Sequence, residues 1–283
     1  MSKVAIVTDS STYLPQEFLE KFPIRVVPVT LIWSGEVLRD GVDIQPQEFY
    51  TRLQTARELP TTSQPSPDAF KEEFEKLLAN GYEILGIFLS SKLSGTFASA
   101  EQAQSMLPNK AIEIIDSLTG SMGAGWPILT AARTAIKGAS LEECKAVAKK
   151  ALKNIGILLV PDSLEYLQRG GRIGRAQRFF GDALHLKPIL EVVEGGFIGL
   201  ERVRTTQKAL KRLLELLEAR ISGRSPIHLG VLHACAPDLA EQLLKEASTR
   251  VKPSETLIAD VSPAVGSHLG PGTVGFAFMA GIE

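Results

Sequence analysis

The chain has 283 residues, which suits one large or two medium domains. Its 31 lysine and arginine residues almost balance 32 aspartate and glutamate residues, giving a net charge of −1. That balance argues against binding of nucleic acid or of a membrane surface through bulk charge. The N-terminal sequence lacks a signal-peptide pattern, and no apolar run nears the ~20 residues of a membrane span, so we expect a cytoplasmic protein.

Strand and helix patterns alternate over about the first 150 residues. Strand patterns cover residues 3–7, 25–33, 83–89 and 111–115, and helix patterns cover residues 15–21, 46–53, 120–136 and 141–153. A further helix begins at Pro67, behind the N-cap candidate Ser66, and residues 59–70 otherwise form an extended loop with three prolines. The alternation predicts a parallel sheet with helices on both faces.

The second half of the chain predicts a different sheet. Strand patterns cover residues 155–160, 188–193, 197–202, 227–233, 256–261 and 273–279, and helix patterns cover residues 161–167, 207–221 and 237–248. Gly195-Gly196 marks a hairpin between the second and third of these strands. We therefore expect a six-stranded mixed sheet covered by helices. The fold class is α/β with two domains, residues 1–153 and residues 154–283.

A hydroxyl-rich loop follows the apolar strand at residues 83–89. It contains Ser90, Ser91, Ser94 and Thr96. Ser94 is expected to cap the next helix, and Gly95 lets the backbone approach a ligand closely. A helix N-terminus with free N–H groups and hydroxyls favours a carboxylate or phosphate. The alternative is an ordinary strand-to-helix loop with a capped helix.

Other polar positions are candidates for the same kind of site. Asp9 follows the first strand and is a general base, a hydrogen-bond acceptor or, as we favour, a helix N-cap. The cluster Thr61-Thr62-Ser63 lies in the extended loop, either as polar surface or as part of a site. His268 lies in a tight loop, residues 266–272, whose glycines and proline fix the backbone path, so its imidazole is either functional or idle.

Four arginines crowd into residues 169–178 beside Gly170-Gly171. They form either a solvated basic loop or a contact for phosphate or a partner, because guanidinium groups bind phosphate in a bidentate manner. The histidines, His185, His228, His233 and His268, and the cysteines, Cys144 and Cys235, lack the spacing of a metal site. We expect reduced cysteines, no metal and no cofactor.

Six motifs together resemble the DegV family of bacterial fatty-acid-binding proteins, which includes FakB. They are TDSS at residues 8–11, PTTSQPSP at 60–67, SSKLSGT at 90–96, YLQRGGRIG at 166–174, VRT at 203–205 and HLGPG at 268–272. They span the whole chain in the family's order. The resemblance implies an α/β/α parallel-sheet domain followed by a six-stranded mixed-sheet domain.

The same resemblance implies a carrier for one long-chain fatty acid. The acid would be buried in the first domain, with its carboxylate at the domain junction. A separate ATP-dependent fatty acid kinase, FakA-like, would convert it to an acyl phosphate for phospholipid synthesis, and the role leaves room for a transient membrane contact. The resemblance assigns the carboxylate to Thr62, Ser63, Ser94 and His268, with Thr61 and Gly95 as secondary members. Arg172 is assigned to kinase engagement, either by docking the kinase or by stabilising the transferred phosphoryl group.

Two competing functions follow from the residues alone. In a serine hydrolase, Ser94 and His268 would act with Asp9 or Asp116, although Ser94 lacks a nucleophile-elbow context. A DNA-binding regulator is disfavoured by the near-neutral charge and the missing recognition motif. Stoichiometric labelling of Ser94 by a serine-directed phosphonate would favour the hydrolase.

Overall fold

The computed structural model describes residues 3–179 and 186–282. Its first sheet has four parallel strands in the order β2-β1-β6-β7. These strands are β1 (Lys3–Asp9), β2 (Ile24–Val27), β6 (Tyr82–Phe88) and β7 (Ile112–Asp116). The parallel sheet predicted from the alternating pattern is confirmed.

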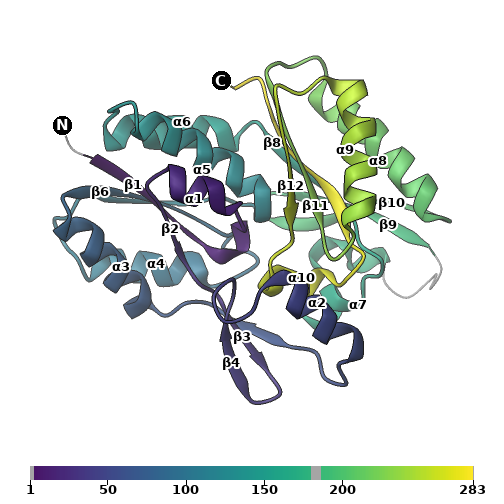
Figure 1. Cartoon of the computed structure of the whole chain (residues 1–283), viewed down its shortest axis with the longest axis horizontal. Coiled ribbons are helices and arrows are strands. Elements are labelled where there is room, and N and C mark those ends of the chain that lie inside the picture. Colours follow the sequence, from purple (N-terminus) through teal and green to yellow (C-terminus); the bar gives the residue numbers. More distant parts are fainter. Residues whose placement is uncertain (1–2, 180–185, 283) are drawn as a thin grey trace.

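Alternate residues of β1 point to opposite faces of this sheet. Val4 and Ile6 pack in the core formed with α5 (Ser121–Ala135) and α6 (Leu141–Leu152). Ala5 and Val7 pack with α3 (Pro67–Ala79) and α4 (Thr96–Ser105). Both faces are therefore covered by helices, as Figure 1 shows and as an apolar parallel strand requires.

A small antiparallel sheet interrupts this unit, with strand order β4-β3-β5. The strands are β3 (Thr30–Trp33), β4 (Glu36–Arg39) and β5 (Thr61–Ser63), and α2 (Pro46–Thr55) follows β4. The single strand predicted at residues 25–33 is thus wrong, because Pro28 has no N–H for a ladder and the chain changes sheet there. The loop predicted at residues 59–70 contains a strand, β5, before the capped helix α3.

The second sheet has six strands in the order β10-β9-β8-β13-β11-β12. They are β8 (Ile155–Val160), β9 (Lys187–Val193), β10 (Gly196–Val203), β11 (Ile227–His233), β12 (Glu255–Asp260) and β13 (Val274–Ala280). The β11–β12 pair is parallel and the other pairs are antiparallel, so the predicted mixed sheet and hairpin are confirmed. One face is covered by α8 (Thr206–Ile221) and α9 (Pro237–Val251).

The other face of the second sheet packs against the first unit. Ile157 and Leu159 share a core with residues of α5, and Trp126 of α5 donates a hydrogen bond of 3.0 Å to the carbonyl oxygen of Ala277. Tyr50 of α2 likewise donates to the carbonyl oxygen of Val261, at 2.9 Å. This inner face of the sheet, turned toward the first unit, forms one wall of the cavity described below.

Two short helices differ from the predictions. α7 (Glu165–Arg169) begins later than the helix expected from residue 161. The predicted loop around His268 is instead largely helical: α10 (Pro263–Leu269) begins behind Ser262, whose hydroxyl accepts from the N–H of Val265. α10 contacts α2, β3, β5 and the 3-10 helix η1 (Ser10–Thr12), so it carries His268 against the first unit.

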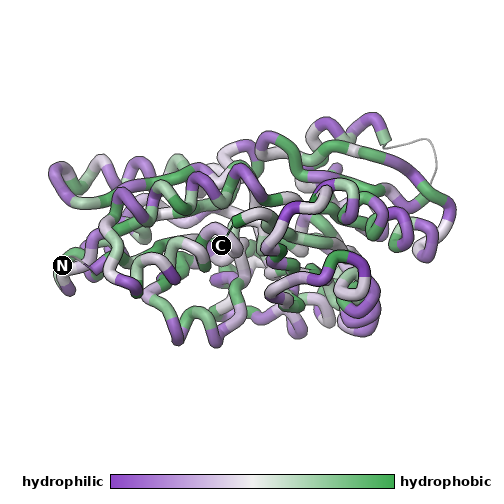
Figure 2. Tube along the Cα trace, turned by 90° about the horizontal axis from the view of Figure 1, so that it is seen from above, coloured by the Kyte–Doolittle hydropathy of each residue, from purple (hydrophilic) through white to green (hydrophobic). Residues whose placement is uncertain are grey.

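The remaining helices are α1 (Gln16–Lys21) and the 3-10 helix η2 (Gly174–Phe179). In Figure 2 the outer helices alternate between hydrophilic and hydrophobic residues along the trace, as expected of helices that bury one face. No helix within the described ranges is long and apolar enough to cross a membrane.

Candidate ligand-binding site

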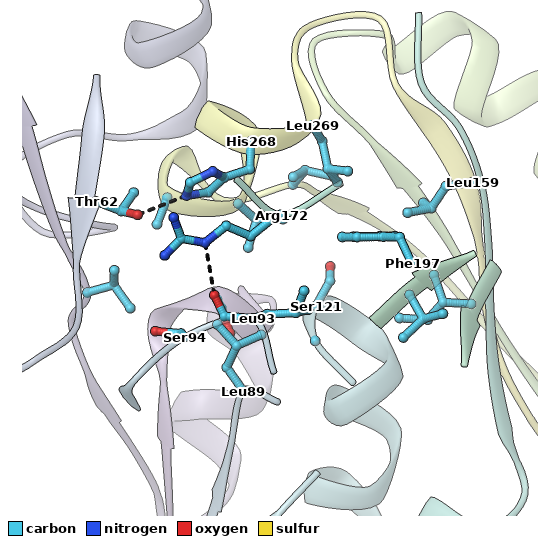
Figure 3. A pocket seen from close by; sticks show the side chains of 18 of the residues that line it. Thr62, Leu89, Leu93, Ser94, Ser121, Leu159, Arg172, Phe197, His268 and Leu269 are labelled. Carbon is cyan, nitrogen blue, oxygen red and sulfur yellow. Dashed lines mark hydrogen bonds between the residues drawn. The ribbon is translucent and has the colours of Figure 1, made fainter. Parts of the chain in front are cut away.

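A cavity lies between the loops of the first unit and the inner face of the six-stranded sheet. It encloses about 870 Å³ of space between its atoms, including its open mouth. Its walls are mostly apolar, with polar groups gathered toward one end (Figure 3).

The polar end joins residues that are far apart in the sequence. Thr62 on β5 and His268 on α10 meet in a hydrogen bond of 2.8 Å between Oγ1 and Nε2. The side chain of Arg172 lies beside this pair, and Ser94 faces it from the loop after β6 (Figure 3). Four expected carboxylate-binding residues, including Ser63, and the expected kinase-engaging arginine therefore line one cavity.

His268 is held as a neutral imidazole at neutral pH. Burial and, to a smaller degree, the positive charge of Arg172 lower its pKa to about 4. Its Nδ1 is buried and has no hydrogen-bond partner among the described residues. Gly170 packs directly against this nitrogen, because a Cβ added at Gly170 would overlap it. The imidazole is thus fixed by a hydrogen bond on one side and by close backbone packing on the other.

Arg172 brings a positive charge to the cavity. Its Nε donates to the carbonyl oxygen of Leu93 at 3.1 Å, and Nη1 donates to that of Gly170 at 2.6 Å. No carboxylate within the described ranges forms an ion pair with it. Arg172 also borders a shallow outer groove with Lys92 and Arg175. An anionic ligand in the cavity would supply the missing countercharge.

The other expected site residues are placed less uniformly. Ser63 lines the cavity and is exposed at its mouth. Ser94 lines the cavity too. The prediction that it caps α4 is wrong, because the N-cap residue is Gly95. Ser94 Oγ instead accepts from the N–H of Thr96 at 3.3 Å and lies 2.9 Å from the hydroxyl oxygen of Thr96. Thr61 is exposed and does not line the cavity, and neither does Gly95.

Asp9 is structural, as favoured from the sequence. Its carboxylate accepts from the N–H of Ser11 at 3.0 Å, which caps η1, and from the N–H of Leu89 at 2.8 Å. Burial raises its pKa. Asp116 accepts from backbone N–H groups of Ser91 and Leu118 instead of orienting an imidazole. Within the described ranges, no carboxylate is hydrogen-bonded to His268, so a hydrolase triad is not assembled.

Two residues at the cavity were missed by the sequence analysis. Gln64 lines the mouth, and its side chain packs over Gly95, where a Cβ would lie 2.9 Å from Nε2. Its position directly after the Thr-Thr-Ser cluster is the signal that could have revealed it. Ser121 lines the cavity from the first residue of α5, and its backbone has a φ of 46°. Nothing in the sequence indicates that conformation.

The apolar wall comes largely from the second half of the chain. The apolar residues that line the cavity are Val29, Leu89, Leu93, Ile157, Leu159, Val192, Phe197, Leu232, Val261, Ala264, Val265 and Leu269. Ile157, Leu159, Val192, Phe197 and Leu232 belong to strands of the six-stranded sheet. The polar end is nearer the surface, since Ser63 and Gln64 are exposed whereas Ile157 and Leu232 are buried.

No cluster of three or more potential metal ligands occurs in the part of the chain that the structure describes. His228 pairs with Glu255 at 2.9 Å, and His233 lies 3.5 Å from Asp260, both on β11–β12. His185 lies outside the described residues. The two cysteines are free thiols.

Comparisons with known proteins found matches along nearly the whole chain. The family model described as "Uncharacterised protein, DegV family" matches residues 3–281. A DegV domain-containing protein of Clostridium perfringens is 33% identical over 279 residues, covering 97% of this chain and 98% of that protein. Protein DegV of Bacillus subtilis is 33% identical over 276 residues, covering 97% and 98%.

Solved structures show the same fold. A Thermus thermophilus DegV family protein described as fatty-acid binding superposes with a TM-score of 0.93 at 34% identity, covering 98% of this chain and 99% of that one. DegV of Bacillus subtilis, described as a fatty acid binding protein, gives a TM-score of 0.90 at 32% identity, covering 99% and 100%. The two-sheet architecture expected from the motif resemblance is therefore confirmed.

Proposed function

Because this chain belongs to the DegV family, we propose that it is a carrier that binds one long-chain fatty acid. Related DegV proteins of known structure are described as binding fatty acids. The observation that carries the proposal is the cavity itself, which has an extended apolar wall and one polar end with an arginine that no carboxylate of the described residues pairs with. An amphipathic ligand with a single anionic head matches that division.

We assign the carboxylate to the polar end. The hydroxyls of Thr62 and Ser94, the imidazole of His268 and the guanidinium of Arg172 converge there, and Ser63 and Gln64 border the mouth. If Nε2–H of the neutral imidazole donates to Thr62 Oγ1, the Thr62 hydroxyl is left free to donate to the carboxylate. Hydrogen bonds to a charged group contribute about 1.5–3 kcal/mol each, so this set is strong enough to fix the head.

The tail extends along the inner face of the six-stranded sheet. The buried side chains of Ile157, Leu159 and Leu232 remove it from water. Each buried methylene contributes about 0.8 kcal/mol, which lets a long tail bind despite the entropy lost on ordering it. We thus propose that the tail lies between the two units, whereas the family resemblance alone implied that it lies within the first domain.

We propose further that the carrier presents its carboxylate to a separate fatty acid kinase. In that reaction a carboxylate oxygen bonds to the γ-phosphorus of ATP, the bond to the ADP oxygen breaks, and an acyl phosphate forms. The polar end lies beside exposed residues, which supports access by a second protein. Arg172 faces both the cavity and the outer groove, so its charge can reach a phosphoryl group arriving there.

The test of fatty-acid binding is mass spectrometry of lipid extracted from the purified, denatured protein. We expect about one long-chain acyl species per protein chain. After delipidation, the protein should take up a labelled fatty acid with the same stoichiometry. An extract without acyl species, together with no uptake of labelled fatty acid, would refute the carrier function.

A further inference from the structure

The hydroxyl group of Ser121 is a second polar group in the cavity, and it lies in the apolar part. This residue is 6% exposed, and its Oγ is buried without a hydrogen-bond partner among the described residues. Figure 3 shows its hydroxyl oxygen projecting into the cavity, on the side of the apolar wall and away from Thr62. Leaving a buried hydroxyl unsatisfied is unfavourable, so this oxygen needs a partner from the cavity.

The backbone around Ser121 adds donors at the same place. Ser121 is the first residue of α5, and the N-cap position is Gly120, which makes no side-chain capping bond. The N–H groups of Gly123 and Ala124 donate to the carbonyl oxygen of Gly120, which leaves those of Ser121 and Met122 without a recorded partner among the described residues. Ser121 also holds a φ of 46°, a left-handed conformation that an L-residue adopts at a cost. Ser11 lines the cavity as well, and its side chain lies near the buried carboxyl of Asp9.

We propose that Ser121 and the N-terminus of α5 form a subsite for a hydrogen-bonding oxygen carried on the acyl chain. The ligand class is then a fatty acid with a hydroxyl group along its tail. A plain alkyl chain passing Ser121 offers this hydroxyl nothing, whereas a chain hydroxyl can either donate to it or accept from it. The inference rests on the proposed function, because it refines which fatty acids the cavity prefers.

The experiment compares wild-type protein with Ser121→Gly, after delipidation. Glycine removes the hydroxyl and tolerates the positive φ, so the helix should start as before. Ser121→Ala is the second variant, which retains a side chain at the start of α5. Ser222→Gly is the matched control: Ser222 also has a φ of 46°, but it is the exposed C-cap of α8.

Dissociation constants are measured for stearic acid and for a series of its monohydroxy positional isomers. The quantity compared is the affinity for one hydroxy isomer divided by the affinity for stearic acid. We expect this ratio to be roughly tenfold higher in wild-type protein and Ser222→Gly than in Ser121→Gly and Ser121→Ala, which corresponds to one net hydrogen bond. Stearic acid should bind Ser222→Gly as it binds wild-type protein, and it should bind Ser121→Gly and Ser121→Ala at least as tightly, because an alkyl chain leaves the Ser121 hydroxyl without a partner.

Each other outcome overturns the inference. If wild-type protein and Ser121→Gly rank the isomers identically, Ser121 is satisfied by water and the subsite does not exist, while the carrier function stands. If neither protein binds stearic acid or any isomer, the carrier function fails with it. Folding of the variants is verified by circular dichroism before the comparison.

Discussion

Thr62 Oγ1 and His268 Nε2 lie 2.8 Å apart, which ties β5 to α10 across 206 positions of the chain. If this pair holds the carboxylate, Thr62→Val should weaken binding of a fatty acid by about 1.5–3 kcal/mol, as a lost hydrogen bond to a charged group does. Binding of the corresponding fatty alcohol should fall less, because the alcohol carries no anion. Titration with a fluorescent fatty acid and displacement by the alcohol would measure both.

Thr61→Val is the matched control for this change. Thr61 is the preceding residue on β5, but it is exposed and does not line the cavity. The two substitutions have the same chemistry and differ in the direction of one side chain. Equal losses at both positions would contradict the assignment of Thr62 to the carboxylate.

The fold was largely predictable because its signals are local. Alternation of strand and helix patterns gave the parallel sheet, and Gly195-Gly196 gave the hairpin of β9 and β10. The predictions were wrong where contacts between distant segments determine the local structure. Thr61–Ser63 is polar and short, and it becomes a strand only because β3 pairs with it. α10 was missed although Ser262-Pro263 has the signature of a helix start.

The site was predictable only in part. Hydroxyls after strands and an imidazole in a glycine-rich segment indicated an anion, but neither the cavity nor its apolar wall is visible in a sequence. Ser121 could not be found at all, because its positive φ and its burial depend on how α5 packs against the second sheet. The expectation that the ligand is a lipid came from the motif resemblance, whereas the division of the cavity into a polar end and an apolar wall came from the structure.

The proximity of Arg172 to His268 predicts that removing the guanidinium group raises the pKa of His268. Positive charge on Arg172 helps to lower the pKa of His268 to about 4, with burial as the larger cause. Arg172→Gln should therefore raise that pKa, while burial keeps it below the ordinary value of about 6.5. NMR titration of the His268 ring in delipidated protein would measure the change. An unchanged pKa would show that the two groups do not interact.

The same arginine is expected to matter more for acyl transfer than for retention of the lipid. Arg172→Ala should retain part of its fatty acid but lose most acyl-phosphate formation with the cognate kinase, measured at equal lipid loading. Reduced kinase affinity would indicate docking, and unchanged affinity would indicate stabilisation of the phosphoryl group. Arg169→Ala is the control, because Arg169 is exposed and pairs with Glu165 on α7.

Asp40 predicts a pH dependence of stability. Burial, with a smaller effect of the negative charge on Asp9, raises its pKa to about 7, although Ser10 donates to it at 2.7 Å. A raised carboxyl pKa favours the protonated native state, so this stabilisation is complete below about pH 4 and is lost as the pH rises through 7. Relative to Asp40→Asn, wild-type protein should lose up to about 1.4 kcal/mol per pH unit in that window.

Urea unfolding at several pH values between 4 and 8 would measure this difference. Asp43→Asn serves as the control, because Asp43 is exposed and its pKa is lowered to about 2 by hydrogen bonds from Arg39. Its contribution is lost only as the pH falls toward 2, so the Asp43→Asn difference should be flat between pH 5 and 7. A flat difference for Asp40→Asn would show that Asp40 is ionised in the native protein throughout.

Substitution by alanine is expected to affect different properties at Gly170 and at Gly171: fatty-acid affinity at Gly170 and stability at Gly171. Gly170 has an ordinary helical backbone, φ −75°, but an added Cβ would overlap Nδ1 of His268. Gly171 has a φ of 71° with no atom within 4 Å of an added Cβ. Gly171→Ala should therefore cost about 1 kcal/mol of stability through backbone strain and leave fatty-acid affinity nearly unchanged.

Gly170→Ala should instead displace the imidazole and break its hydrogen bond with Thr62. We expect Gly170→Ala to reduce fatty-acid affinity about as much as His268→Ala does. In the double variant, Gly170→Ala should reduce affinity less, because the imidazole that it displaces is then absent. Affinity and unfolding free energy, measured on the same preparations, separate the two variants. Full additivity of Gly170→Ala and His268→Ala would show that Gly170 does not act through the imidazole.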